Sequence, residues 1–282
     1  MTATPGLLEY CDPHAWSVHH FGLPAPRWNA LAGKAVWVTG AGTGFGAAIA
    51  TALAAAGGHP ILTGRRREKL EDAREAMRIF GVDPAAAMVL PCDVRDEMQL
   101  ASATSEIARR FEALFGLVIC AALPQVGPTP RPLADSSLES WRAMLDTNVT
   151  APWLTARAAL PLMLGARQVR MVLLTSEAGW AATPGFGPYN ISKAALNALG
   201  MSIAAETAAQ NSAADVQINV LNPGEARSEM NRGSTVSPYT AVAMTLALLS
   251  HPLGGPNGYF FARDGRHLEF AYAKAWGKPL LP

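Results

Sequence analysis

The stretch that decides the fold is residues 34–57, KAVWVTGAGTGFGAAIATALAAAG. Its start, residues 35–39, is a short apolar run typical of a buried strand. Residues 46–57 are rich in alanine and precede a second glycine, a pattern typical of a helix and its end. The glycines in between allow a tight turn of the backbone. The stretch therefore predicts a strand that turns directly into a helix.

The same alternation of strands and helices continues along the chain. Further strands are predicted at residues 59–64, 86–91, 114–122, 168–176 and 215–223, and helices at 66–80, 137–164 and 189–209. Strands separated by helices form parallel sheets, joined by right-handed crossovers and buried on both faces. We expect an α/β fold: a Rossmann-type, doubly wound parallel sheet of about seven strands, flanked by helices, in a single domain.

This domain is predicted to span residues 33–282, as the dinucleotide-binding and catalytic domain. Residues 1–32 show no clear periodicity and are interpreted as an N-terminal arm that packs on the domain or on a neighbouring subunit. A chain of 282 residues, half of them hydrophobic, can form one α/β unit with a sizeable core.

Composition excludes several classes of function. A net charge of +1 gives no sign of a nucleic-acid or acidic-membrane partner, and the apolar runs are shorter than the about 20 residues that cross a bilayer. Cys11, Cys92 and Cys120 are odd in number and lack metal-type spacing, which favours a reducing compartment and no metal site. Without a recognisable secretory signal, a cytoplasmic location is expected.

The glycine-rich turn TGAGTGFG, residues 39–46, has the features of a phosphate-binding site. Glycines let the backbone approach a pyrophosphate closely, and the start of the following helix offers unpaired N–H groups and a positive dipole. About 20 residues later, an acidic residue at the end of the second strand would favour NAD. Arg65, Arg66 and Arg67 stand there instead, and guanidinium groups can pair with a 2′-phosphate. We therefore expect NADP as the cofactor, with NAD as the alternative.

Tyr189 and Lys193 are four residues apart on a predicted helix and so share one face. A nearby ammonium favours the ionised form of a phenol, so Lys193 is expected to lower the pKa of Tyr189 and make it a better proton shuttle near neutral pH. Ser176 ends a predicted strand and could hydrogen-bond the substrate oxygen, although a turn cap is the commoner use of serine.

Taken together, these motifs resemble the short-chain dehydrogenase/reductase family in its single-domain form, over roughly residues 33–265. The resemblance implies Ser176, Tyr189, Lys193 and Asn148 as the catalytic residues. It implies a cofactor site formed by Gly40, Thr43, Gly44, Phe45, Gly46, Arg65, Arg66, Asp93, Val94, Ala121, Ala122, Pro223, Gly224 and Ser228. In this comparison Asp93 would hold the adenine amine, and the segment from Pro223 to Ser228 would face the nicotinamide.

The sequence departs from the family at three places. Ile119 and Cys120 replace two asparagines, which leaves open how the fourth strand is braced. Glu225 and Arg227 stand where the family has apolar or small residues, and we expect them to form an ion pair or to meet a polar substrate. The segment after Ser228 is shorter than the family's usual lid, which predicts a more open pocket, and we hypothesise that the arm closes it.

The sequence thus predicts an oxidoreductase that passes hydride between NADP(H) and a carbonyl or alcohol, with Tyr189 as general acid or base. Alternatives are an NAD-dependent alcohol or sugar dehydrogenase, a non-catalytic dinucleotide-binding module and, least favoured, a Ser/Lys hydrolase. The expected partners are a small carbonyl or alcohol substrate and further copies of the chain, as a homodimer or homotetramer. The candidate walls of the substrate pocket are Leu123, Pro124, Gln125, Glu177, Phe186 and Met230.

Overall fold

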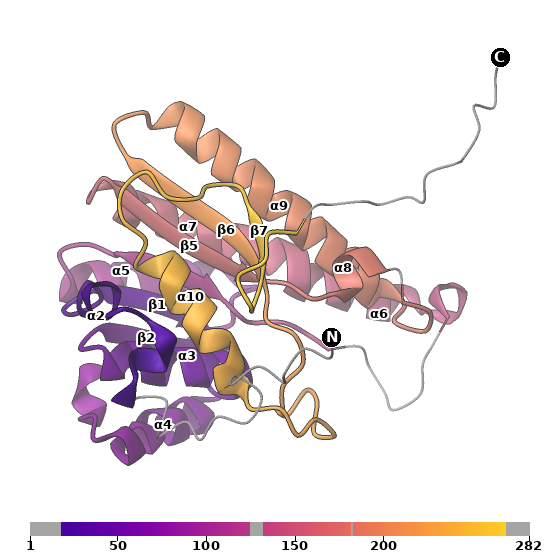
Figure 1. The fold of residues 1–282 in the computed structure, drawn as a ribbon. Coiled ribbons are helices and arrows are strands. Elements are labelled where there is room, and N and C mark those ends of the chain that lie inside the picture. The colour runs from indigo at the N-terminus through magenta and orange to yellow at the C-terminus, as the bar shows by residue number, and fades with distance from the viewer. Residues whose placement is uncertain (1–17, 125–131, 182, 269–282) are drawn as a thin grey trace, which may run out of the picture.

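The computed structural model describes residues 18–124, 132–181 and 183–268. In this part of the chain, seven parallel strands form one sheet in the order β3-β2-β1-β4-β5-β6-β7 (Figure 1). The strands are β1 (Ala35–Thr39), β2 (His59–Gly64), β3 (Met88–Pro91), β4 (Gly116–Ile119), β5 (Gln168–Leu174), β6 (Asp215–Asn222) and β7 (Phe260–Ala262). The predicted doubly wound parallel sheet is confirmed.

Helices cover both faces of this sheet (Figure 1). One face carries α3 (Gly44–Ala55), α4 (Arg67–Ala76) and α10 (Val242–Leu249), and the other carries α5 (Glu97–Arg110), α7 (Ala151–Leu164) and α9 (Pro188–Gln210). Shorter elements are η2 (His20–Gly22), α2 (Ala25–Asn29), η3 (Met77–Phe80), η4 (Pro84–Ala86), η5 (Leu133–Asp135), α6 (Leu138–Leu145), η6 (Asp146–Thr150), α8 (Ala178–Ala181) and η7 (Pro238–Ala241). Among the described residues, no helix is long and apolar enough to span a membrane.

The first strand shows how the sheet is stabilised from both sides. Side chains alternate along a strand, so Val36 and Val38 pack in the core under α3 and α10, whereas Trp37 packs in the core under α5 and α7. The buried indole N–H of Trp37 donates to Oγ1 of Thr63 on the neighbouring strand at 2.8 Å. Burial on both faces is the reason that these strands read as continuous apolar runs.

The strand order shows where a ligand-binding crevice can form at the edge of the sheet. The chain moves outward from β1 through β2 to β3, and then returns to β4 on the other side of β1. Loops that leave β1 and β4 therefore diverge, which opens a crevice beyond the carboxyl ends of these two strands. The glycine-rich turn, between β1 and α3, lies at this crevice.

The predicted long helix at 137–164 is interrupted. It consists of α6, a π-helical turn η6 and α7. Pro152 has no N–H to donate to the carbonyl of Asn148, as an α-helix would require, and this breaks the regular pattern at the turn. The structure also adds β7, a strand of three residues that no sequence pattern indicated.

The described part of the N-terminal arm packs on the domain. Phe21, Trp28 and Leu31 are buried in the core on the α10 side. The ring of Phe21 stacks on that of Tyr239 with 5.8 Å between centroids. Residues 1–17 lie outside the described residues, and the division of the chain at residue 32 stays a prediction.

Candidate active site

A cavity of about 530 Å³ lies at the carboxyl ends of the central strands. It is lined by all the predicted cofactor-binding residues: Gly40, Thr43, Gly44, Phe45, Gly46, Arg65, Arg66, Asp93, Val94, Ala121, Ala122, Pro223, Gly224 and Ser228. Ser176, Tyr189 and Lys193 line the same cavity. The structure therefore brings together residues that are up to 188 positions apart, from Gly40 to Ser228.

The glycine-rich turn forms the floor of this cavity. Its backbone is packed so closely that side chains would not fit at Gly40 or Gly46. Gly40 has φ +64°, and a Cβ there would lie 2.9 Å from Cα of Ala121. A Cβ on Gly46 would lie 2.4 Å from the carbonyl oxygen of Gly40. Helix α3 begins at Gly44, and its N-cap residue Thr43 makes no side-chain cap hydrogen bond. The first N–H groups of the helix thus lack a capping side chain and suit an anion.

Thr39 braces the ends of β1 and β4, where the family's asparagines are missing. Its fully buried Oγ1 accepts hydrogen bonds from the backbone N–H groups of Cys120 and Ala121, at 3.1 and 3.2 Å. The loop that leaves β4 is thereby held against the glycine-rich turn. No local sequence pattern indicates this function of Thr39, because its partners are 81 and 82 positions away.

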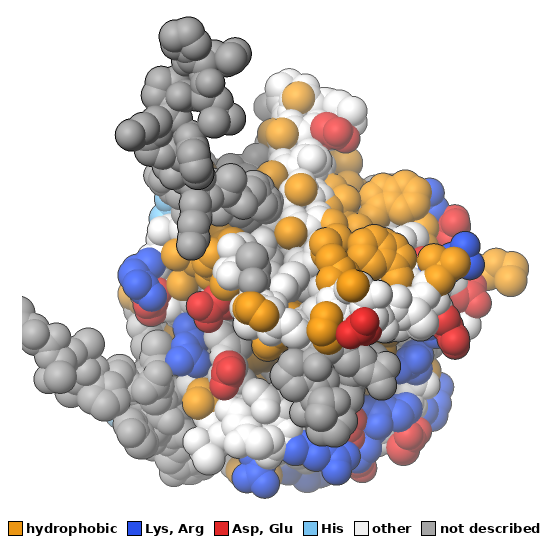
Figure 2. Space-filling model, turned by 90° about the vertical axis from the view of Figure 1, so that its right-hand side faces the viewer, with side chains coloured by type: hydrophobic (Ala, Val, Ile, Leu, Met, Phe, Trp, Pro, Cys, Tyr) orange, Lys and Arg blue, Asp and Glu red, His pale blue; other side chains and the backbone are white. Residues whose placement is uncertain are grey.

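Basic side chains gather at one end of the cavity. Arg65, Arg66, Lys69 and Arg95 all line it. Arg66 is paired with Glu229 at 2.5 Å, whereas Arg65 is exposed and has no ion pair with another described residue. Figure 2 shows Lys and Arg side chains along the lower part of its face, at the height of α4 in Figure 1. The positive charge at this end suits a phosphate group.

Asp93 lies at this basic end, but its carboxylate is already engaged. Arg95 binds both carboxylate oxygens, with Nη2 2.6 Å from Oδ2 and Nε 3.0 Å from Oδ1. The hydrogen bonds from Arg95 hold the pKa of Asp93 below its ordinary value. Arg95 and Lys69 line the cavity but were not predicted from the sequence. The position of Lys69, one helical turn after Arg65 and Arg66, was an available signal.

Lys193 is buried at the other end of the cavity. Its Nζ lies 5.7 Å from the centre of the Tyr189 ring and donates to the carbonyl oxygen of Leu174 at 3.2 Å. Burial lowers the pKa of Lys193 from its ordinary value of 10.5 to about 8. Helix α9 presents Tyr189 and Lys193 on one face, as their spacing predicted.

The expected direction of the Tyr189 pKa shift is wrong for this structure. Burial raises the pKa of Tyr189, and a hydrogen bond with Ser176 lowers it to a smaller extent. The same burial that raises the phenol pKa also disfavours the charged form of Lys193, so the lysine does not dominate. Ser176 additionally accepts a hydrogen bond from the N–H of Ala178 at 3.2 Å, which is the turn-capping use of serine.

Asn148 does not line the cavity. Its fully buried amide accepts from the N–H of Leu123 at 2.7 Å and donates to the carbonyl oxygen of Leu123 and to Oγ of Ser192, both at 3.0 Å. Ser192 in turn donates to the carbonyl oxygen of Tyr189 at 2.8 Å. The side chain of Asn148 thus ties the loop after β4 to the first turn of α9, rather than contacting Lys193.

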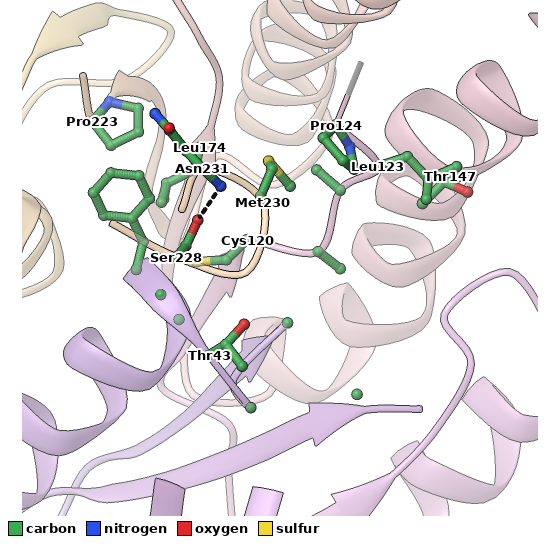
Figure 3. A pocket seen from close by; sticks show the side chains of 18 of the residues that line it. Thr43, Cys120, Leu123, Pro124, Thr147, Leu174, Pro223, Ser228, Met230 and Asn231 are labelled. Carbon is green, nitrogen blue, oxygen red and sulfur yellow. Dashed lines mark hydrogen bonds between the residues drawn. The ribbon is translucent and has the colours of Figure 1, made fainter. Parts of the chain in front are cut away.

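Several apolar side chains line the cavity, among them Leu123, Pro124, Leu174 and Met230 (Figure 3). Of the predicted wall residues, Leu123, Pro124, Phe186 and Met230 line the cavity, Glu177 does not, and Gln125 lies outside the described residues. Cys120 and Thr147 also line it and were not predicted. Burial raises the pKa of the Cys120 thiol to about 12, which keeps it protonated.

The structure bears on two expectations about the surrounding loops. Glu225 and Arg227 form no ion pair with each other: Glu225 lines the cavity, and the backbone N–H of Arg227 donates to the carbonyl oxygen of Val236 at 2.8 Å. The described part of the N-terminal arm does not line the cavity, since it packs against α10 and η7 instead. The short segment after Ser228 lies over the glycine-rich turn, with Ser228 against Gly44.

Comparison with known proteins gives a consistent result. The family model described as short chain dehydrogenase matches residues 34–237. The human protein named dehydrogenase/reductase SDR family member 4 is 29% identical over 252 residues, which cover 89% of this chain and 87% of that protein.

Solved structures show the same fold. A putative short-chain alcohol dehydrogenase from Sinorhizobium meliloti superposes with a TM-score of 0.70 and 28% identity, covering 83% of this chain and 96% of that one. A putative short chain dehydrogenase from Shigella flexneri, crystallised in complex with NADP, has a TM-score of 0.74 and 22% identity, covering 84% and 99% of the two chains.

Proposed function

Because this chain belongs to the short-chain dehydrogenase/reductase family, we propose that it transfers hydride between NADP(H) and a small carbonyl or alcohol substrate. Members of the family are oxidoreductases. For this chain we propose in addition that NADP(H) is the cofactor and that Ser176, Tyr189 and Lys193 are the catalytic residues. The observation that carries it is the convergence of Ser176, Tyr189 and Lys193 on the same cavity as the glycine-rich turn and the basic cluster.

The residues of the cavity fit a dinucleotide. The uncapped start of α3 and the glycine-rich turn suit a pyrophosphate, since N–H groups are available there and side chains are absent. Arg65 supports NADP over NAD because its guanidinium lines the cavity and forms no ion pair within 4 Å with a carboxylate of the described residues. When bound, the nicotinamide supplies or accepts the hydride.

The chain's own residues would bind and protonate the substrate. Ser176 and Tyr189 would donate hydrogen bonds to the carbonyl oxygen and polarise it. Burial raises the pKa of Tyr189, so the phenol is protonated at neutral pH and ready to act as the acid in the reductive direction. Lys193, with a pKa of about 8, carries a proton near neutral pH and can return one toward Tyr189. Asn148 would hold the loop and helix that position these groups.

The catalytic proposal is tested with a panel of aldehydes and ketones, by following NADPH absorbance. Tyr189→Phe should lower kcat by about 10²-fold or more, as for loss of an acid–base group, while the Kd for NADPH stays within about twofold. Tyr239→Phe is the matched control, because this half-buried tyrosine lies outside the cavity. Equal turnover by wild type and Tyr189→Phe would refute the assigned role. Turnover by neither protein, despite NADPH binding, would favour a non-catalytic binding module.

The cofactor proposal is tested separately by calorimetry. Arg65→Ala should raise the Kd for NADPH by roughly tenfold or more, because a hydrogen bond to a charged group contributes about 1.5–3 kcal/mol, and should leave the Kd for NADH unchanged. Arg67→Ala is the control, since Arg67 is two positions away, exposed and outside the cavity. If wild type binds NADH as tightly as NADPH, and Arg65→Ala affects both alike, the chain is better described as an NAD-dependent dehydrogenase.

We also propose that the chain forms a homodimer or homotetramer. Leu138 on α6, Trp153 on α7 and Ile191 on α9 expose large apolar side chains, with 61%, 43% and 39% of their surface accessible. Figure 2 shows hydrophobic side chains gathered in the upper half of its face. Clustered apolar surface favours association. Light scattering after gel filtration at micromolar concentration measures the state directly, and a single monomeric species would contradict the proposal.

A further inference from the structure

The turn formed by residues 228–231 lies across the glycine-rich turn. Ser228 packs on Gly44 so closely that a Cβ at Gly44 would be 3.0 Å from Cβ of Ser228. The turn is held together by two hydrogen bonds, from the N–H of Asn231 to Oγ of Ser228 at 3.1 Å and from the N–H of Ser228 to the carbonyl oxygen of Asn231 at 3.2 Å. Figure 3 shows Ser228, Met230 and Asn231 on one side of the cavity, with Thr43 facing them from below. The turn is therefore in contact with the phosphate-binding floor.

Glu229 extends from this turn to the basic end of the cavity. Its Oε2 lies 2.5 Å from Nη2 of Arg66, and its Oε1 lies 3.8 Å from Nζ of Lys69. Both cations line the cavity. The hydrogen bond from Arg66 lowers the pKa of Glu229, so the carboxylate is ionised at neutral pH. The carboxylate of Glu229, from the loop after β6, thus interacts with two of the basic side chains that follow β2, Arg66 and Lys69.

We propose that Glu229 is a specificity-determining residue that competes with the cofactor's 2′-phosphate for Arg66 and Lys69. The inference rests on the proposed NADP(H) function and deepens it. A carboxylate and a phosphate bind a guanidinium through the same donor groups, so Arg66 cannot bind both fully at once. Arg65 forms no comparable ion pair with a carboxylate of the described residues and would make the first contact with the phosphate. Glu229 therefore limits the preference for the 2′-phosphorylated cofactor.

The exposure of the ion pair sets the size of the effect. Arg66 and Glu229 expose 52% and 37% of their side-chain surfaces, and exposed ion pairs are weak and screened by salt. Loss of the competitor should therefore change affinity by about threefold to fivefold, rather than by orders of magnitude. The change should also shrink at high ionic strength.

The test uses the full chain and two small probes that differ only in the 2′-phosphate, adenosine 2′,5′-bisphosphate and adenosine 5′-monophosphate. Calorimetry should show that Glu229→Gln lowers the Kd for the bisphosphate by about threefold to fivefold and leaves the Kd for the monophosphate within about twofold. Glu75→Gln is the matched control, because Glu75 pairs with Arg78 at 2.8 Å outside the cavity and its loss changes the net charge equally. In an Arg66→Ala background, Glu229→Gln should have a much smaller effect.

The outcomes separate this inference from the proposed function. If wild type prefers the bisphosphate and Glu229→Gln binds it no more tightly, the competition is overturned while the NADP preference stands. If neither protein prefers the bisphosphate, both the competition and the NADP preference are overturned. If Glu229→Gln tightens both probes equally, the lost charge acts on the 5′-phosphate that both probes carry, and competition for the 2′-phosphate is refuted. Equal midpoints of urea unfolding for the variants and wild type would show that the substitutions do not change stability, so that differences in Kd report binding alone.

Discussion

Replacing Lys193 with methionine should change the stability of this protein in a pH-dependent way. The lysine is 3% exposed, and burial lowers its pKa from 10.5 to about 8. At about 1.4 kcal/mol for each tenfold change in an equilibrium constant, the charged lysine costs the folded state about 3 kcal/mol near pH 7. Methionine has a similar length and no charge, so the variant removes this cost.

The direction of the pH dependence follows from how many protons Lys193 binds in the folded and in the unfolded chain. Because the folded-state pKa of Lys193 is lowered, the unfolded chain binds more protons between about pH 8 and pH 10.5, and the contribution of this group to the free energy of unfolding rises across that window. The cost is complete below about pH 8 and disappears above about pH 10.5. Near pH 9.5 it should be about 1.4 kcal/mol, so the advantage of the variant over wild type should shrink by about 2 kcal/mol from pH 7 to pH 9.5.

Methionine also leaves the carbonyl oxygen of Leu174 without its hydrogen bond from Lys193, at a cost of about 1–3 kcal/mol. This loss reduces the gain at every pH alike and leaves the pH dependence intact. The assay is urea unfolding followed by tryptophan fluorescence at both pH values. Leu196→Met, a buried position one turn along α9, is the control and should show no such dependence. A difference between Lys193→Met and wild type that is the same at both pH values would refute the reasoning.

Two further predictions concern stability and are measured by urea unfolding near neutral pH. Thr39→Val should destabilise the protein by about 1–3 kcal/mol, because it leaves the partly buried N–H groups of Cys120 and Ala121 without their acceptor. A change within about 0.5 kcal/mol of wild type would contradict the bracing role. Asp215→Ala should cost about 3 kcal/mol or more, because Arg170 is 2% exposed and would lose its carboxylate partner at 2.6 Å; a neutral effect would show that the backbone carbonyls around Arg170 suffice.

Local patterns were sufficient to predict the general fold and most of the residues around the cavity. The glycine-rich turn between an apolar strand and an alanine-rich helix predicted a phosphate site, and the spacing of Tyr189 and Lys193 placed both on one helix face. Strand–helix alternation then implied that these segments meet at one edge of a parallel sheet. These inferences succeeded because periodicity and turn chemistry depend on neighbours in the sequence.

Contacts between distant segments were decided only by the tertiary structure. No local pattern relates Glu229 to Arg66, 163 positions away, or Thr39 to Cys120, 81 positions away. The direction of the Tyr189 pKa shift also depends on how deeply packing buries the phenol, which its spacing from Lys193 does not reveal. The sequence thus indicated most of the strands and helices and the reactive groups that they carry, but not β7 or the break between α6 and α7. Packing determined the polar environment of those groups, because burial and long-range ion pairs arise only when the chain is folded.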